Sequence, residues 1–220
     1  MPKKYDKKVF NPKYFQWEHW LNDEQEKAYE IYKQNDIIFL IGPAGTGKTH
    51  LAIAFAIRDV LSKERNHIVL SRPVVEAGEH LGFLPGDMDE KVYPYMLPLY
   101  DCLDKICGRD SENRKYVDER YELAPLAFLR GRTFDGAVCI LDEAQNCTTG
   151  QLKLFLTRLG KYSKMIVTGD PTQTDLPWDQ SGLMEVIKKV RDIEGVGVVE
   201  FSESAIVRHP LVAQIVKRIK

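Results

Sequence analysis

The feature that most constrains this chain is the segment 36–61, in which an apolar run, a glycine-rich loop and an apolar helical pattern follow one another. Residues 36–41 read Asp-Ile-Ile-Phe-Leu-Ile, as in a buried strand, and residues 42–49 read Gly-Pro-Ala-Gly-Thr-Gly-Lys-Thr. This G-x-x-x-x-G-K-T pattern turns backbone N–H groups inward around phosphate oxygens, and the next helix directs its positive end at the same anion. The order strand, loop, helix predicts a nucleoside triphosphate site.

Individual positions of this loop have predicted roles. Lys48 supplies a cation to the β- and γ-phosphates, and the Thr49 hydroxyl is offered to Mg²⁺. The residues expected to contact the nucleotide are Gly42, Pro43, Ala44, Gly45, Thr46, Gly47, Lys48, Thr49 and His50.

The rest of the sequence alternates predicted strands and helices. Short runs rich in Val, Ile and Leu, typical of strands covered on both faces, occur at 37–41, 67–71, 137–141, 164–168 and 196–201. Helices are predicted at 22–34, 49–61, 150–159, 181–191 and 211–219. With 220 residues, of which 44% are hydrophobic, the chain has room for one full core. We predict an α/β fold, a parallel sheet with helices on both faces.

One region interrupts this alternation, because residues 72–136 separate two predicted strands. It opens with Gly82-Phe83-Leu84-Pro85-Gly86 and continues through a polar, predicted helical segment at about 87–120. Excursions of this length in compact domains are usually functional or disordered, and its several tyrosines favour an ordered one. We predict a helical excursion at about 82–122.

The apolar strand at 137–141 ends in the acidic pair Asp142-Glu143. A Mg²⁺-dependent hydrolase requires such a pair: Asp142 would hold Mg²⁺ through a water, and Glu143 would polarise the attacking water. The alternative is a strand that merely ends in solvated carboxylates. The glycine-rich loop at 42–49, the predicted phosphate loop, favours the hydrolase. The Asp-Glu pair favours hydrolysis over transfer to a bound alcohol.

A further buried strand, at 164–168, leads into Gly169-Asp170-Pro171-Thr172-Gln173. Ligands of open α/β sheets lie outside the carboxyl ends of the strands, so we expect 42–49, 142–145 and 169–173 to converge. Gln173 would then sense the γ-phosphate, and Asp170 would orient water or metal. An ordinary Gly-Asp-Pro turn is the alternative.

Two residues outside these loops are also candidates. Gln25 carries a donor and an acceptor that match an adenine edge, although a capped amphipathic helix would look the same. Arg208 precedes the last predicted helix. Hydrolases stabilise charge on the γ-phosphoryl with an arginine in cis or from a neighbour, and a surface arginine is the alternative.

Composition limits the partners and the setting. The formal net charge is −1, so any contact with nucleic acid must use local patches. One such patch is the basic run at 1–19, for which a solvated tail is the alternative. No stretch approaches ~20 apolar residues, no signal peptide is recognised, and the four cysteines lack metal or disulfide spacing. We expect no membrane association and a reduced, cytoplasmic setting.

These motifs together resemble superfamily-one helicases and, more closely, the PhoH-like ATPase family. The closer resemblance is carried by 71–87 (Ser-Arg-Pro-Val-Val-Glu-Ala-Gly-Glu-His-Leu-Gly-Phe-Leu-Pro-Gly-Asp), 125–133 and 207–212. It implies a RecA-like P-loop NTPase core at 20–220, ATP and Mg²⁺, and action on RNA or single-stranded DNA. It also favours Arg208 as the arginine finger. Some relatives carry an added PIN-type nuclease or KH-type segment, and we expect neither here.

A single RecA-like core has a physical consequence. Superfamily-one helicases close the ATP site between two such cores, so we expect a homo-oligomer, a hexameric ring in which the next subunit completes each site. In that ring Arg72 and the 82–87 turn would face the channel, and Arg130 and Arg132 are further candidates for contacts to nucleic-acid phosphates. The alternative for all three arginines is a place on the ordinary surface.

The favoured function is therefore an ATPase coupled to movement on, or remodelling of, single-stranded RNA or DNA. Two alternatives stay open: a nucleotide-gated assembly ATPase that moves nothing, and a phosphotransferase with the 72–136 excursion as its lid. Glu143 and Gln173 suit water activation, which argues against the phosphotransferase.

Overall fold

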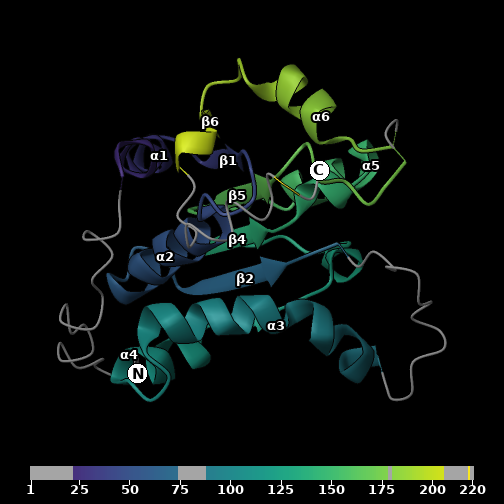
Figure 1. Ribbon diagram of the computed structural model, residues 1–220. Coiled ribbons are helices and arrows are strands. Elements are labelled where there is room, and N and C mark those ends of the chain that lie inside the picture. The colour runs from purple at the N-terminus through teal and green to yellow at the C-terminus, as the bar shows by residue number, and fades with distance from the viewer. Residues whose placement is uncertain (1–21, 74–87, 178–179, 206–217, 219–220) are drawn as a thin grey trace.

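The computed structural model describes residues 22–73, 88–177, 180–205 and 218. In these ranges the chain forms one six-stranded sheet in the order β3-β2-β4-β5-β1-β6, and every pair of neighbours is parallel (Figure 1). The strands are β1 (Ile37–Ile41), β2 (His67–Ser71), β3 (Tyr121–Leu123), β4 (Ala137–Leu141), β5 (Lys164–Gly169) and β6 (Val196–Glu200). The predicted α/β fold with a parallel sheet is confirmed.

Helices connect the strands close to the predicted places. They are α1 (Asp23–Gln34), α2 (Lys48–Leu61), α3 (Met88–Cys107), α4 (Glu112–Asp118), α5 (Thr149–Leu156) and α6 (Leu183–Val190). Single 3₁₀ turns lie at η4 (Leu126–Leu129), η5 (Ala144–Asn146) and η6 (Glu203–Ala205). The basic tail predicted at 1–19 lies outside the described residues, as does nearly all of the helix predicted at 211–219.

The two faces of the sheet carry different helices. Side chains alternate along a strand, so Ile38 and Leu40 of β1 join the core beneath α1, α2, α3 and α4, whereas Phe39 and Ile41 join the core beneath α5 and α6. Because both faces are covered, the central strands are apolar at nearly every position, which is why the sequence shows them as continuous Val, Ile and Leu runs.

The strand order decides which loops meet. β5 lies between β1 and β4, with Ile41 opposite Gly169 on one side and Leu141 opposite Val167 on the other. Since all three strands run the same way, the segments after residues 41, 141 and 169 leave the sheet at one edge. This edge carries the candidate site.

The predicted helical excursion contains a strand that the sequence analysis missed. Tyr121–Leu123 forms β3, which pairs with β2 only and stands at the edge of the sheet. Its three residues are all partly exposed, and so short a segment offers no periodicity from which a strand can be predicted.

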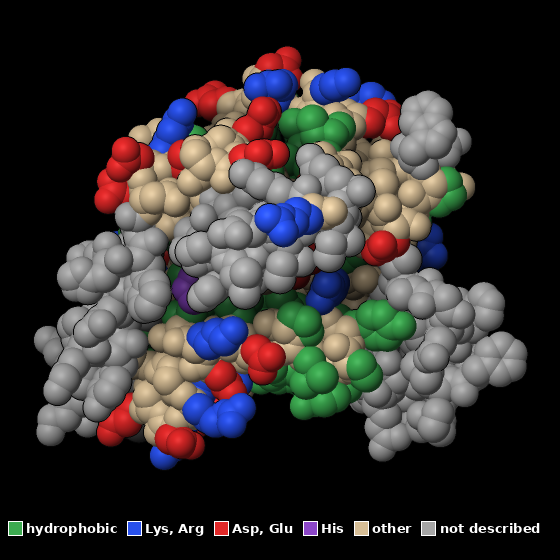
Figure 2. All heavy atoms as spheres, viewed as in Figure 1, with side chains coloured by type: hydrophobic (Ala, Val, Ile, Leu, Met, Phe, Trp, Pro, Cys, Tyr) green, Lys and Arg blue, Asp and Glu red, His purple; other side chains and the backbone are tan. Residues whose placement is uncertain are grey.

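The excursion otherwise consists of α3 and α4, which pack on the same face as α2. α3 contains two prolines, Pro94 and Pro98. Figure 2 shows hydrophobic side chains gathered over this part of α3, where Tyr93 and Leu97 keep 52% and 39% of their surface exposed. Further along α3, Leu99 and Leu103 are fully buried.

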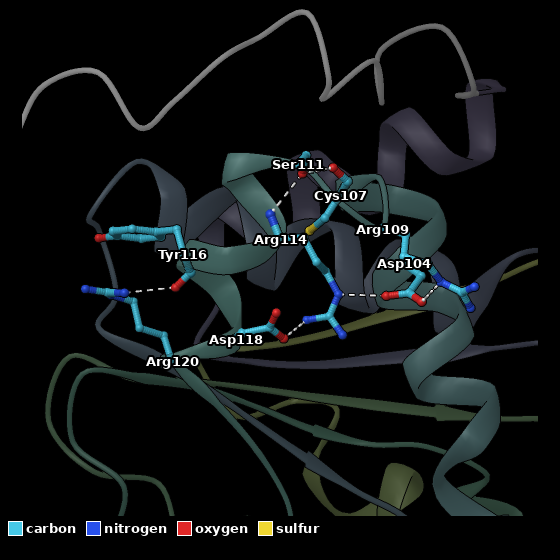
Figure 3. Close-up of polar contacts among 8 residues, drawn as sticks. All are labelled: Asp104, Cys107, Arg109, Ser111, Arg114, Tyr116, Asp118 and Arg120. Carbon is cyan, nitrogen blue, oxygen red and sulfur yellow. Dashed lines mark hydrogen bonds and ion pairs between the residues drawn. The ribbon is translucent and has the colours of Figure 1, made fainter.

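A network of ion pairs fixes α3 to α4 (Figure 3). Arg114 Nε donates to Asp104 Oδ1 at 2.8 Å, and its Nη1 pairs with Asp118. Arg109 binds the second Asp104 oxygen at 3.0 Å. Hydrogen bonds from Arg114 and then Arg109 lower the pKa of Asp104 below its ordinary value. Arg114 is buried, so the network specifies how the two helices meet.

The four cysteines are all free and buried. Within the described ranges, the structure contains no helix whose length and apolar character would suit a membrane crossing.

Candidate nucleotide-binding site

A cavity of about 360 Å³ opens at the carboxyl edge of the sheet. Three predicted segments contribute to its wall: the glycine-rich loop, the acidic pair after β4 and the turn after β5. The lining residues are Ala44, Gly45, Gly47, Lys48, Thr49, His50, Arg72, Pro98, Cys102, Lys105, Asp142, Glu143, Thr168, Gly169, Asp170 and Gln173. The structure thus brings together segments that are more than a hundred residues apart in the sequence.

The loop between β1 and α2 takes its shape from glycines. Gly47 has φ of 84° and caps α2, so the loop runs directly into the helix N-terminus. Gly42 has φ of 149°, and a Cβ at this position would lie 2.6 Å from the carbonyl oxygen of Phe201. Both positions therefore require glycine. The resulting turn places Gly45, Gly47 and the N-terminus of α2 in the cavity wall, and a glycine-rich turn before a helix N-terminus is suited to phosphate.

The remaining loop residues form the back of the turn. Thr46 is fully buried, and its hydroxyl donates to the Pro43 carbonyl at 3.0 Å. Lys48 Nζ donates to the Gly42 and Pro43 carbonyls at 2.6 and 2.8 Å. The ammonium group therefore lies over the loop itself, at the cavity wall, where a phosphate oxygen would meet it.

Asp142 connects the loop to the centre of the sheet. Its Oδ1 accepts hydrogen bonds from Thr49 Oγ1 at 2.6 Å and from Thr168 Oγ1 at 2.5 Å. Thr49 lies in the first turn of α2, Thr168 lies on β5 and Asp142 follows β4, so one carboxylate oxygen joins three parts of the fold at the cavity wall. Asp142 itself keeps only 3% of its surface exposed.

These oxygens fit a magnesium ion. Mg²⁺ usually takes one or two protein carboxylates, with waters and substrate phosphates as its other ligands. Thr49 and Asp142 supply a hydroxyl and a carboxylate beside the phosphate loop. Asp170, also in the wall, has a buried Oδ2 without a hydrogen-bond partner in the described structure. An unpartnered carboxylate oxygen is costly in protein alone and suits an ordered water or a hydrated cation.

Glu143 stands one residue further along and adopts a strained backbone. Its φ and ψ are 56° and 41°, in the left-handed region that non-glycine residues rarely occupy. Glu143 Oε2 accepts from Gln145 Nε2 at 2.5 Å, and Gln145 Oε1 accepts from the Asp170 N–H at 3.1 Å. The buried Gln145 amide therefore joins the acidic pair to the turn after β5. Strained residues of this kind gather at functional sites, where their surroundings hold them.

The turn after β5 is built around Asp170. Its Oδ1 accepts from the N–H and hydroxyl of Thr172, at 3.0 and 2.7 Å, and its carbonyl accepts from the Gln173 N–H at 3.0 Å. This turn places Gln173 in the cavity wall. The γ-phosphate role of Gln173 remains a prediction.

Gln25 lies beneath the phosphate loop, apart from the residues that line the cavity. Its side chain forms a capping box with Asn22, and Gln25 Nε2 donates to the Thr46 carbonyl at 3.1 Å. Both ends of the amide thus bind protein, and the side chain supports the loop next to Gly47. The contact of Gln25 with adenine remains a prediction. It would require the side chain to replace these hydrogen bonds with bonds to the base.

One wall of the cavity was not foreseen from the sequence. α3 contributes Pro98, Cys102 and Lys105, and His50, in the first turn of α2, also lines the cavity. Cys102 Sγ lies 3.6 Å from His50 Nδ1. Desolvation and then Lys105 lower the pKa of His50, while burial and then Asp142 raise the pKa of Cys102 to about 12. The sequence contains no local signal for this wall, because α3 carries no motif that indicates contact with the cavity.

The predicted arginines occupy different places. Arg72 lines the cavity and pairs with Glu143. Arg132 pairs with Glu122 at 2.6 Å and lies over the Phe134 ring, whereas Arg130 is exposed; neither lines the cavity. Arg208 falls outside the described residues, as does the 82–87 turn.

Known proteins are similar to this chain over most of its length. The family model for PhoH-like proteins matches residues 19–220. The chain is 52% identical over 194 residues to a PhoH-like protein of Bacillus subtilis (strain 168), covering 88% of this chain and 61% of the relative. It is 43% identical over 193 residues to protein PhoH of Escherichia coli (strain K12), covering 86% and 54%.

These curated relatives are longer proteins, of which the chain spans little more than half. Among solved structures, the large terminase of the thermophilic bacteriophage D6E superposes with a TM-score of 0.55 over 90% of this chain and 50% of the terminase. Its sequence identity is 10%, so this likeness concerns the fold alone.

Proposed function

Because the chain belongs to the PhoH-like protein family and has the fold of a P-loop NTPase, we propose that it is a Mg²⁺-dependent ATP hydrolase. The observation that carries the proposal is the position of Asp142, whose carboxylate meets the Thr49 hydroxyl at 2.6 Å beside the phosphate loop. Glu143 follows it in the same cavity wall. The residues proposed for the phosphates, the cation and the attacking water thus adjoin one another, which supports hydrolysis.

Each side chain has a distinct part in this proposal. The loop N–H groups and the N-terminus of α2 bind the phosphates, and Lys48 moves from the loop carbonyls to the β- and γ-phosphates. Thr49 and, through a water, Asp142 would hold Mg²⁺, which would neutralise charge on the phosphates when bound. Glu143 accepts a proton from the attacking water. Gln173 contacts the γ-phosphate, and Arg208 completes the site in cis or from a neighbouring subunit.

We further propose that hydrolysis is coupled to single-stranded RNA or DNA. Support comes from η4 and the residues after it, at the end of β3, where Phe128 is 48% exposed and Arg130 is exposed. An aromatic ring on which a base can stack, next to a guanidinium for a phosphate, is the usual means of binding single strands without sequence preference. Arg132, two residues after Arg130 and paired with Glu122, would add a second cation on leaving that carboxylate.

Assembly into a hexameric ring is part of the same proposal. The cavity is lined by one RecA-like core, and a neighbouring subunit would cover its open side and supply Arg208. The molar mass in solution, measured by light scattering with and without ATP, tests this. A monomer that hydrolyses ATP at the full rate would contradict the ring.

The deciding experiment for the function is the ATP hydrolysis rate with and without single-stranded RNA and DNA, at low and at moderate salt. We expect stimulation by one or both polymers, and this stimulation should weaken as salt rises because phosphate contacts are salt-dependent. An ATP hydrolysis rate that neither polymer changes would favour an assembly ATPase. Phosphate release that requires an added alcohol would favour a phosphotransferase.

A further inference from the structure

Arg72 follows β2 directly and lies beside the acidic pair Asp142-Glu143, which follows β4. β2 and β4 are paired up to Ser71 and Leu141, and the Asp142 N–H donates to the Ser71 carbonyl at 2.9 Å. The next residue on each strand therefore leaves the sheet beside the other. This placement brings a guanidinium group to the carboxylates that the proposed hydrolysis uses.

The Arg72 guanidinium makes two contacts with its two terminal nitrogens. Nη2 lies 3.4 Å from Glu143 Oε1, and Nη1 donates to the Tyr95 carbonyl of α3 at 3.1 Å. The side chain is 22% exposed and lines the cavity. One rigid fork thus joins the proposed base to the excursion helix.

The partner on α3 is a carbonyl in the turn that contains both prolines. Pro98 has no N–H for the carbonyl of Pro94, and its ring crowds the preceding turn, so regular hydrogen bonding is interrupted there. Carbonyls in such a turn can accept donors from outside the helix. The Tyr95 carbonyl takes Arg72, and Pro98 itself lines the cavity.

On the other side, Glu143 continues the same chain of contacts. Its second oxygen accepts from Gln145, which in turn accepts the Asp170 N–H. Arg72 and Gln145 therefore hold the carboxylate from opposite ends while its backbone remains in the left-handed region. The side chain that must meet the attacking water has its orientation set by these two donors.

We propose that Arg72 is a positioning residue for hydrolysis, which fixes the Glu143 carboxylate by tying it to the interrupted turn of α3. The inference rests on the proposed hydrolase function. It differs from the expectation that Arg72 contacts nucleic acid, because it assigns Arg72 a role that operates when no polymer is present.

The test compares Arg72→Ala and Arg72→Lys with a matched control, Arg191→Ala, which removes an exposed arginine after α6. ATP hydrolysis is measured without polymer, and kcat and KM are resolved separately. We expect Arg72→Ala to lower kcat at least tenfold with KM changed less than about threefold, because a misplaced catalytic group costs rate far more than binding. Arg72→Lys should recover part of kcat, since lysine keeps the charge but lacks the fork.

Two results would overturn the proposal. An unchanged kcat without polymer, together with weaker binding of a labelled single-stranded oligonucleotide, would make Arg72 a nucleic-acid contact. A rise in KM with kcat unchanged would make Arg72 a direct ligand of the nucleotide. Melting temperatures close to the wild type are expected throughout, because a partly exposed ion pair adds little stability.

A second measurement does not depend on hydrolysis. Amide hydrogen exchange over residues 94–100 should be faster in Arg72→Ala than in the wild type and in Arg191→Ala, because the link to the Tyr95 carbonyl is lost. If wild-type and Lys48→Ala chains released phosphate equally slowly, the hydrolase function would fail, yet this exchange difference would still report the link. Unchanged exchange would show that Arg72 does not hold α3, and the proposal would fail by itself.

Discussion

The two walls of the cavity are built in different ways. The sheet-edge wall follows β1, β4 and β5, and its side chains bind one another at short distances, as Asp142 does with Thr49 and Thr168. The α3 wall presents Pro98, Cys102 and Lys105 from a helix whose other face is packed in the core. Asp142, Glu143 and Asp170 each have polar partners in the site, whereas Cys102 of α3 makes a longer contact at this wall, with His50 at 3.6 Å.

This difference separates the chemistry of the site from its shape. A polar network at a parallel sheet edge fixes atoms to within hydrogen-bond geometry, which suits groups that must act on a phosphate. A helix that closes the opposite side sets the depth of the cavity and adds charge at longer range. Substitutions in the sheet-edge wall should therefore lower the hydrolysis rate or the ATP affinity by orders of magnitude. Substitutions in the α3 wall should have much smaller effects on both.

Glu143→Gln should have the largest effect. Loss of the proton acceptor should lower kcat by about 10²–10⁴-fold, while ATP still binds, because the phosphate loop is intact. Steady-state hydrolysis and the equilibrium binding of a fluorescent ATP analogue measure the two quantities. The exposed Glu194→Gln is the matched control, and a Glu143→Gln rate near the wild type would remove Glu143 as the base.

Lys48→Ala should come next. It removes the cation that is proposed to reach two phosphates, and charge-assisted bonds of this kind are strong, so ATP affinity should fall about 100-fold, or about 2.7 kcal/mol. Calorimetric titration with ATP in the presence of Mg²⁺ measures this, with the exposed Lys188→Ala as control. An affinity within threefold of the wild type would contradict the predicted role of Lys48.

Lys105→Ala tests the α3 wall. Lys105 is exposed at the cavity rim, where water screens its charge, so KM for ATP should rise only about three- to tenfold with little change in kcat. Lys115→Ala, an exposed lysine of α4 outside the cavity, is the matched control. If Lys105→Ala lowered kcat as much as Glu143→Gln does, the distinction between the two walls would be wrong.

The smallest effect concerns His50, where the two walls touch. Desolvation and then Lys105 hold its pKa below the ordinary 6.5, so Lys105→Ala should raise that pKa, and NMR titration of the ring protons measures it. Because the folded state favours the neutral His50 ring, the unfolded state binds the proton first as the pH falls. The contribution of His50 to the free energy of unfolding is therefore present above pH 6.5 and is lost as the pH falls below 6.5. An unchanged His50 pKa in Lys105→Ala would show that the lysine does not act on this ring.

Much of the sheet-edge wall was predictable because its signals are local. The five apolar runs predicted as strands all occur as strands, and β1 and β4 lead directly into the phosphate loop and the acidic pair. The rule that parallel strands end at one edge was enough to expect that these loops meet. Short periodic patterns and glycine-dependent turns survive in sequence because they depend on neighbouring residues.

The sequence by itself thus determined the α/β class, the glycine-rich loop and the three segments that meet at the carboxyl edge of the sheet. Only the tertiary structure decided that Arg72 meets Glu143, that α3 forms the opposite wall, that β3 extends the sheet and that Gln25 supports the loop from beneath. The physical reason is distance along the chain. The sequence shows where the prolines of α3 lie, but the contact between Arg72 and Tyr95 also depends on how α3 packs beside β2, and no local pattern records that packing.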